Sequence, residues 1–169
     1  MPERFASAWW RWLALSAVVV ALDLYTKSIV SASFQYGEVR PVLPFFNLVL
    51  AHNSGAAFSF LAGAGGWQRW FFTVVTIGIS IFIVAMLRKH HTDRLMSVAL
   101  ALVLGGALGN LYDRLTLGHV VDFVQLHAGG WYFPAFNVAD SAITVGMALL
   151  IWDSLVSGTP AAPARQEKT

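Results

Sequence analysis

The chain has 169 residues, of which 57% are hydrophobic and 12% charged, with a net charge of +2 and a mean hydropathy of +0.62. Soluble domains carry about 25% charged residues, so this composition excludes an ordinary soluble domain and indicates that much of the apolar surface faces lipid. The small net charge argues against a nucleic-acid partner, and the lack of cysteine excludes disulfides, thiol nucleophiles and Cys-based metal sites.

Four apolar segments each come close to the roughly 20 residues that span a hydrocarbon core of about 30 Å. They lie at residues 12–30, 70–87, 95–111 and 138–156. Any one of them could be a buried helix of a soluble protein, but four in so short a chain favour transmembrane helices. Residues 1–156 are therefore expected to form one four-span membrane domain.

The N-terminal segment has features of a secretory signal peptide. Arg4 and Arg11 precede the first apolar segment, and the small residues at 31–33 would suit cleavage. However, the segment contains Asp23 and Lys27, and further spans follow it. We therefore expect an uncleaved first span.

The distribution of Lys and Arg predicts the orientation in the membrane. Seven of the 11 basic residues lie before the first span, between the second and third spans, or in the tail: Arg4, Arg11, Arg88, Lys89, Arg94, Arg165 and Lys168. Both termini are thus expected to be cytoplasmic, with longer outer loops at residues 31–69 and 112–137. The tail at residues 157–169 is expected to be disordered, because it combines Gly, Pro, Ala and charges.

The two outer loops differ in composition. Residues 39–50 are rich in strand formers and contain Pro41 and Pro44, which predicts short strands with the prolines at edges or ends. Such strands would form a small sheet on the membrane surface. In the second loop, Gly129 and Gly130 permit a turn, and the aromatic residues that follow suit a membrane interface.

Two carboxylates, Asp122 and Asp140, stand among apolar neighbours, where a charge is costly and usually has a function. If the second outer loop folds back, the two can meet and share one proton, as a pair that acts on water as base and on a leaving group as acid. The alternative is structural: Asp140 caps the fourth helix, and Asp122 is a loop residue bound to backbone. Spacing alone leaves both interpretations open.

Other polar residues lie near the same predicted face. Asn110 and Arg114 are four apart at the end of the third span and share a helix face. Arg114 either binds a lipid phosphate, a peptide carbonyl or a carboxylate, or anchors the helix at the interface with Asp113 as its partner. Asp23 and Lys27 are also four apart, which indicates an internal ion pair with Lys27 reaching towards the interface, and favours a structural or substrate-positioning role over catalysis. Small residues at 105–109 favour close helix packing.

Asn53 either hydrogen-bonds an extended peptide or closes a turn. The five histidines lack metal-binding spacing, so no metal or other cofactor is expected.

Taken together, these segments resemble the bacterial lipoprotein signal peptidase (signal peptidase II) family. The resemblance covers nearly the whole chain and rests on five ordered motifs: DLYTK at 23–27, NSGAAF at 53–58, GGALGNLYDR at 105–114, GHVVDF at 118–123 and FNVAD at 136–140. It implies that Asp122 and Asp140 are the catalytic aspartates. It implies supporting or substrate-binding roles for the other motif residues: Asp23, Lys27, Asn53, Gly55, Asn110, Arg114 and Asn137.

The resemblance also implies a fold and a substrate. The expected fold is an all-α membrane protein with four transmembrane helices, a small periplasmic β-sheet or cradle, and a periplasmic loop or short helix. The implied location is the bacterial inner membrane, with the active site near the periplasmic face. The implied substrate is a prolipoprotein carrying diacylglycerol, cut before its lipidated cysteine, and membrane phospholipid and the inhibitor globomycin are the other implied partners.

Two other classes of protein merit comparison. A transporter or proton relay would place charges near the bilayer midplane and contain inverted repeats, but here the charges gather at one edge and no repeat is evident. A presenilin-type intramembrane protease would carry a Gly-x-Gly-Asp motif and more spans. The aspartic membrane endopeptidase therefore agrees best with the sequence.

Overall fold

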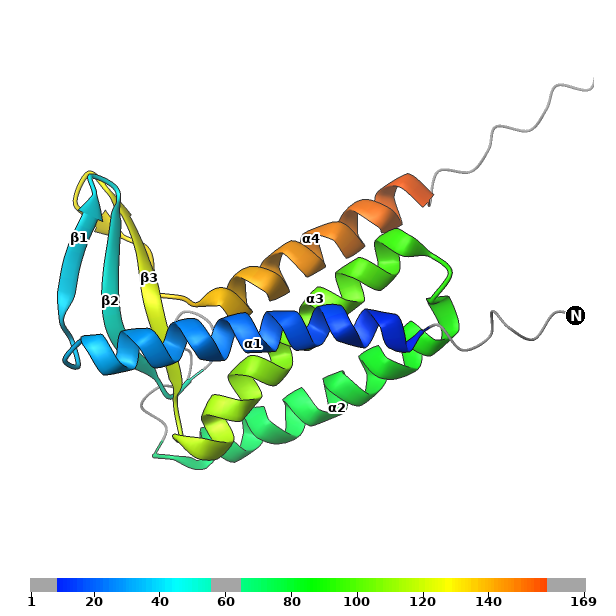
Figure 1. Ribbon diagram of the computed structural model, residues 1–169, viewed down its shortest axis with the longest axis horizontal. Coiled ribbons are helices and arrows are strands. Elements are labelled where there is room, and N and C mark those ends of the chain that lie inside the picture. Colours follow the sequence, from blue (N-terminus) through cyan, green and yellow to red (C-terminus); the bar gives the residue numbers. More distant parts are fainter. Residues whose placement is uncertain (1–8, 56–64, 158–169) are drawn as a thin grey trace, which may run out of the picture.

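The computed structural model describes residues 9–55 and 65–157. Four helices lie side by side along its long axis: α1 (Trp10–Ser33), α2 (Trp67–His90), α3 (Arg94–Thr116) and α4 (Val138–Ser157) (Figure 1). All four are long and apolar enough to cross a membrane. The prediction of four membrane-spanning helices is confirmed in this sense. The 56–64 segment and the tail from residue 158 lie outside the described residues.

The helices extend beyond the apolar segments that predicted them, most of all at the end of α3. This helix continues past Leu111 to Thr116, so that Asp113 and Arg114 are helical residues rather than part of a loop. At its other end the Asp93 side chain accepts a hydrogen bond from the Met96 amide at 3.1 Å, which is a usual N-cap. Polar residues can thus continue or cap a helix beyond the hydrocarbon-like part of its sequence.

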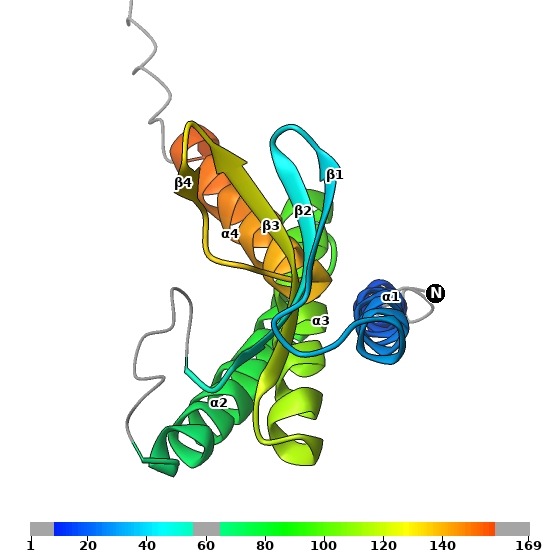
Figure 2. The same cartoon turned by 90° about the vertical axis from the view of Figure 1, so that its left-hand side faces the viewer.

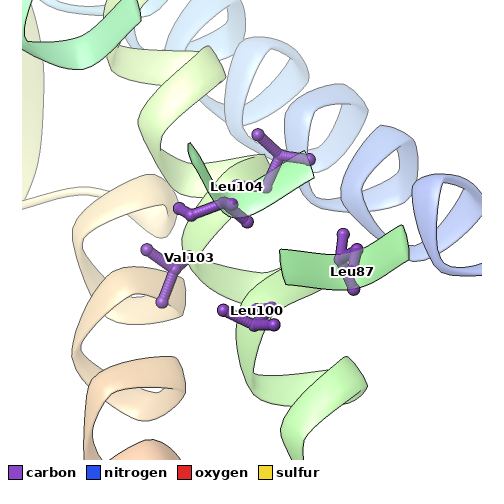
Figure 3. Close-up of a cluster of buried hydrophobic side chains, with 5 residues drawn as sticks. Leu87, Leu100, Val103 and Leu104 are labelled. Atoms are coloured by element: carbon purple, nitrogen blue, oxygen red, sulfur yellow. The ribbon is translucent and has the colours of Figure 1, made fainter. Parts of the chain in front are cut away.

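Helix α3 occupies the centre of the bundle. It is 67% buried over its apolar window, against 28%, 22% and 11% for α1, α2 and α4, and it packs on all three of them (Figure 2). Leu100, Val103 and Leu104 project from α3 into an apolar cluster that includes Leu87 of α2 (Figure 3). The other three helices leave most of their apolar surface exposed, as a lipid environment requires.

Glycines on α3 permit this close packing. A Cβ atom at Gly105 would lie 2.8 Å from the Ser16 carbonyl oxygen of α1, and one at Gly106 would meet the Ala139 carbonyl oxygen of α4. Real side chains do not tolerate such contacts with backbone. The predicted packing role of the small residues at 105–109 is confirmed.

A small antiparallel sheet lies at one end of the bundle. Its strands are β1 (Val39–Leu43), β2 (Phe46–Asn53), β3 (Val120–Ala128) and β4 (Trp131–Tyr132), in that spatial order (Figure 1). The beginning of α1, the end of α4 and the α2–α3 turn lie at the opposite end.

The first outer loop forms strands as predicted, with Pro41 on the edge strand β1 and Pro44 between β1 and β2. The second outer loop needs correction, because it was expected to be a turn with interfacial aromatics. It also supplies the long strand β3, which pairs with β2. Pairing with β2, which is distant in sequence, stabilises this strand, and local composition does not reveal that partner.

Replacement of Gly106 by Ala should destabilise the bundle. The new methyl group would press on the Ala139 carbonyl and on Ile143 Cγ1, 2.7 Å away. We expect a lower unfolding temperature in detergent, equivalent to about 1–3 kcal/mol of overpacking. Gly78→Ala is the matched control, because a Cβ there has no neighbour within 4 Å in the described structure. Equal unfolding temperatures for the two variants would contradict the proposed role of Gly106.

Candidate active site

Asp122 and Asp140 lie close together at the sheet end of the bundle. Asp122 is a residue of strand β3, paired with Ala51 of β2, and it is only 2% exposed. Asp140 is in the first turn of α4. The interpretation of Asp122 as a loop residue is therefore wrong: the sheet holds this carboxylate on a rigid element.

Asn137 connects the two carboxylates directly. Its side-chain Nδ2 donates a hydrogen bond of 2.7 Å to Asp122 Oδ1. Its Oδ1 accepts from the Asp140 amide at 2.9 Å, while its own amide donates to Asp140 Oδ2 at 3.3 Å. This reciprocal pair is a capping box, so Asp140 helps to cap α4 and also faces Asp122. The capping role of Asp140 is confirmed, and it is compatible with a role beside Asp122.

The environment of Asp122 favours its protonated form. Burial and, to a smaller extent, the nearby charge of Asp140 raise the pKa of Asp122 to about 7, although hydrogen bonds from Asn53 and Asn137 oppose the shift. A buried carboxyl that faces a second carboxylate retains a proton at a pH where an exposed aspartate would lose it. The pair can thus hold one acid and one base near neutral pH.

Asn110 of α3 fixes the position of Asp140. Its Nδ2 donates to Asp140 Oδ1 at 2.8 Å. Its Oδ1 accepts from Lys27 Nζ at 3.0 Å and from Asn137 Nδ2 at 3.2 Å. Because both ends of the amide have partners, its orientation is determined by the network.

Lys27 is the cation of this network. Its Nζ lies 2.6 Å from Asp23 Oδ2 and 2.9 Å from Asp113 Oδ2, and its side chain is only 4% exposed. The internal ion pair of Asp23 and Lys27 is present. The expectation that Lys27 reaches towards the interface is wrong, because the ammonium is enclosed between α1 and α3. Its partners there are carboxylates instead of water.

Asp113 is a network residue that the sequence analysis did not select. Besides its ion pair with Lys27, its Oδ2 accepts a hydrogen bond of 3.1 Å from the Val121 amide, one residue before Asp122. It therefore ties strand β3 to α3. The available signal was its place three residues after Asn110, on the same side of the helix, but its nearest apparent partner in the sequence was Arg114.

Asp23 joins α1 to the start of α4. Its Oδ1 accepts a hydrogen bond of 2.9 Å from the Ala139 amide, next to Asp140. Gly109 makes room for this carboxylate, since a Cβ at that position would lie 2.6 Å from Asp23 Oδ2. The motif glycine and the motif aspartate thus depend on one another.

Arg114 brings the segment after β2 to the site. Its Nη2 donates to the Gly55 carbonyl oxygen at 3.0 Å, and its Nη1 donates to the Asn110 carbonyl oxygen at 3.3 Å. Its guanidinium also lies over the Phe72 ring of α2, at 5.5 Å from Cζ to the ring centroid. The alternative in which Asp113 is the partner of Arg114 is wrong, because Asp113 pairs with Lys27.

Asn53 and Gly55 belong to the same site. Asn53 Oδ1 accepts a hydrogen bond of 3.0 Å from the Gly55 amide and so closes a turn after β2. The Asn53 side chain also bonds Asp122. The structure thus brings together all nine residues that the sequence selected, and within residues 9–55 and 65–157 it groups no three His, Asp or Glu side chains as a metal ion would require.

Comparisons with known proteins agree with this arrangement. The family model described as signal peptidase (SPase) II matches residues 15–156. The lipoprotein signal peptidases of Janthinobacterium sp. (strain Marseille) and Burkholderia mallei (strain SAVP1) are each 56% identical over 144 residues, which cover 85% of this chain and 87% of theirs.

Solved structures are similar over most of the chain. A bacterial membrane enzyme determined by the in meso method at 2.3 Å resolution matches with a TM-score of 0.80 and 35% identity, over 94% of this chain and 93% of the other. A second, at 1.9 Å resolution, matches with a TM-score of 0.76 and 36% identity, over 88% and 94%. The fold and site define a multi-pass membrane protease. The chain belongs to the signal peptidase II family.

Replacement of Lys27 by Met should strongly destabilise the protein. The variant would leave Asp23 and Asp113 buried without their shared cation. Removing one partner of a buried ion pair typically costs about 3–5 kcal/mol, so we expect a markedly lower unfolding temperature in detergent. Lys89→Met is the matched control, because Lys89 is exposed at the end of α2. An unchanged unfolding temperature for Lys27→Met would show that the ion pairs do not hold the bundle together.

Proposed function

We propose that this protein removes the signal peptide from diacylglyceryl-modified prolipoproteins by aspartic catalysis, cutting before the lipidated cysteine. Membership of the signal peptidase II family supports the substrate class, because its relatives are lipoprotein signal peptidases. The observation that carries the mechanism is the Asn137 bridge between Asp122 and Asp140. A buried and a half-buried carboxylate held by one amide are suited to share a proton and activate water.

The reaction follows from the protonation of the pair. Asp140, as carboxylate, takes a proton from a water molecule, whose oxygen attacks the scissile carbonyl carbon. Protonated Asp122 gives its proton to the carbonyl oxygen, which forms a neutral tetrahedral diol. Asp122 then recovers a proton from a diol hydroxyl, Asp140 protonates the leaving nitrogen, and the carbon–nitrogen bond breaks. The pair ends in its starting state.

The surrounding donors position the pair and the substrate. Asn110 and Asn137 orient the Asp140 carboxylate through hydrogen bonds to its two oxygens. Arg114 holds the Gly55 carbonyl and, through it, the strand end that carries Asn53. We assign Arg114 and Asn53 to the positioning of the substrate peptide, with Asn53 as a donor towards the tetrahedral intermediate. Asp23 and Lys27 support the site through their hydrogen bonds with Ala139 and Asn110, respectively.

The proposed orientation places this site at the outer face of the bacterial inner membrane, with both termini in the cytoplasm. Arg88, Lys89 and Arg94 lie at the end of the bundle opposite the sheet, which supports a cytoplasmic position for that end. A diacylglyceryl chain would then lie in the outer leaflet beside the exposed helix faces. The scissile bond would lie at the boundary, where water for hydrolysis is available.

Asp122→Asn and Asp140→Asn should each abolish cleavage of a diacylglyceryl-modified precursor, because an amide can supply neither the base nor the shared proton. Loss of either carboxylate in such a pair is expected to lower kcat by at least about 10³-fold. The measurement is the release of signal peptide by purified protein, followed by mass spectrometry. Wild-type protein should cut the lipidated precursor but not the unmodified one, and globomycin should inhibit it.

Two controls make this assay decisive. Asp153→Asn is a matched variant, since Asp153 lies near the other end of α4. Circular dichroism and unfolding temperature must show that the dyad variants are folded. Full activity in a folded Asp122→Asn or Asp140→Asn variant would refute the dyad, while equal cleavage of both precursors would refute the lipid requirement alone.

Activity should decrease as the pH rises through about 7, because Asp122 then loses the shared proton. The measurement is kcat/KM for the lipidated precursor from about pH 5 to about pH 9, a range that extends about two pH units to either side of the Asp122 pKa. A profile that stays flat over this range would contradict the assignment of Asp122 as the acid.

The same raised pKa gives a separate stability test. Between about pH 4 and about pH 7, folded Asp122 holds a proton that the unfolded chain has lost, so its contribution to stability falls as the pH rises. Asp122→Asn removes this contribution. The unfolding temperature of the variant should therefore decrease less over this window than that of the wild type.

A further inference from the structure

An apolar groove lies between α1 and α2, away from the polar network. Its volume is about 400 Å³. Helix α3 forms part of its lining, and apart from Ser80 and Arg88 the lining residues are apolar: Leu13 of α1, Ile81, Val84 and Ala85 of α2, and Leu104 and Leu108 of α3. None of these residues belongs to the site described above, so the groove is separate from it.

The groove covers about one half of the membrane thickness. Along α2 it runs from Ser80, near the middle of the helix, to Arg88, near the end opposite the sheet (Figure 1). Eight residues of α-helix rise about 12 Å. This length is close to half of the roughly 30 Å hydrocarbon core. The groove therefore matches the depth of one leaflet, on the side of the bundle away from the sheet.

A cation lies at the membrane-surface end of the groove. Arg88 is exposed, and its Cζ atom lies 4.6 Å from the centroid of the Trp9 ring, which holds the guanidinium beside the start of α1. Trp12 Nε1 donates a hydrogen bond of 3.2 Å to the His91 carbonyl oxygen, which ties the same two helix ends together. Guanidinium groups bind phosphate through paired hydrogen bonds. The groove thus combines an apolar slot with a phosphate-binding group at its mouth.

We propose that this groove binds an anionic phospholipid of the leaflet opposite the sheet, with one acyl chain in the slot and the phosphate on Arg88. A hydrocarbon chain fits this lining better than a peptide helix, which is about 10–12 Å wide and brings its own side chains. Charge complementarity and the one-leaflet depth select a lipid over a second copy of the chain. The proposal requires that the helices span a membrane, and it is independent of the peptidase mechanism.

The headgroup contact can be tested by native mass spectrometry of the purified full chain. The probes are palmitoyl-oleoyl phosphatidylglycerol and the phosphatidylcholine with the same acyl chains, each added at equal concentration. We expect the wild type to retain more phosphatidylglycerol, and Arg88→Gln to reduce that retention about fivefold, the effect of one basic residue at a membrane surface. Lys89→Gln is the matched control, because it removes the same charge from the neighbouring position, which does not line the groove.

The acyl-chain contact needs a second pair of variants. Ala85→Phe would fill the slot and should reduce retention of phosphatidylglycerol, whereas Ala17→Phe, on an exposed position of α1 outside the lining, should not. Unfolding temperatures in detergent establish that each variant is folded.

Several results would overturn the proposal. These are equal retention of the two lipids by the wild type, equal losses for Arg88→Gln and Lys89→Gln, or full retention by Ala85→Phe. A dimer in the wild type that Ala85→Phe abolishes would instead assign the groove to a second copy of the chain.

Discussion

A buried positive charge is the constraint on which the arrangement of this protein depends. Lys27 is almost completely buried, so its ammonium requires anionic or polar partners inside the bundle. Asp23, Asp113 and Asn110 supply them from α1 and α3, and their contacts restrict how these two helices pack. Because Asp23 also accepts from the start of α4 and Asp113 from β3, the same cluster fixes the two elements that carry Asp140 and Asp122.

The carboxylate pair lies at the end of this network that is nearest the sheet. The Asn110 side-chain oxygen accepts a hydrogen bond from Lys27, and its nitrogen donates one to Asp140. The Asn137 side-chain oxygen accepts a hydrogen bond from the Asp140 amide, and its nitrogen donates one to Asp122. Each amide is used at both ends, so neither can rotate without losing a buried hydrogen bond. Such a network holds reactive groups in place in a protein that has only a small polar interior.

Different contacts hold the helices together at different levels of the bundle, and the membrane environment explains why such contacts are needed. Within a membrane the hydrophobic effect does not hold helices together, so packing depends on small residues and on internal polar contacts. Around the sheet end the polar network provides those contacts. Midway along α3, Gly105 and Gly106 allow close approach to α1 and α4. Towards the opposite end, α1 and α2 leave the groove between them, with Arg88 at its end.

The four helices could be predicted from the sequence alone, because the length and apolar composition of a span are local properties. The sequence also selected Asp122 and Asp140, since isolated carboxylates in apolar segments are conspicuous without any structure, and the five motifs indicated the family. Three features required the folded structure: residues 120–128 form a strand, Asp113 pairs with Lys27, and Asn137 joins the two carboxylates. Each of these depends on a partner distant in the chain, and hydrogen bonds and ion pairs between distant residues leave no periodicity in the sequence.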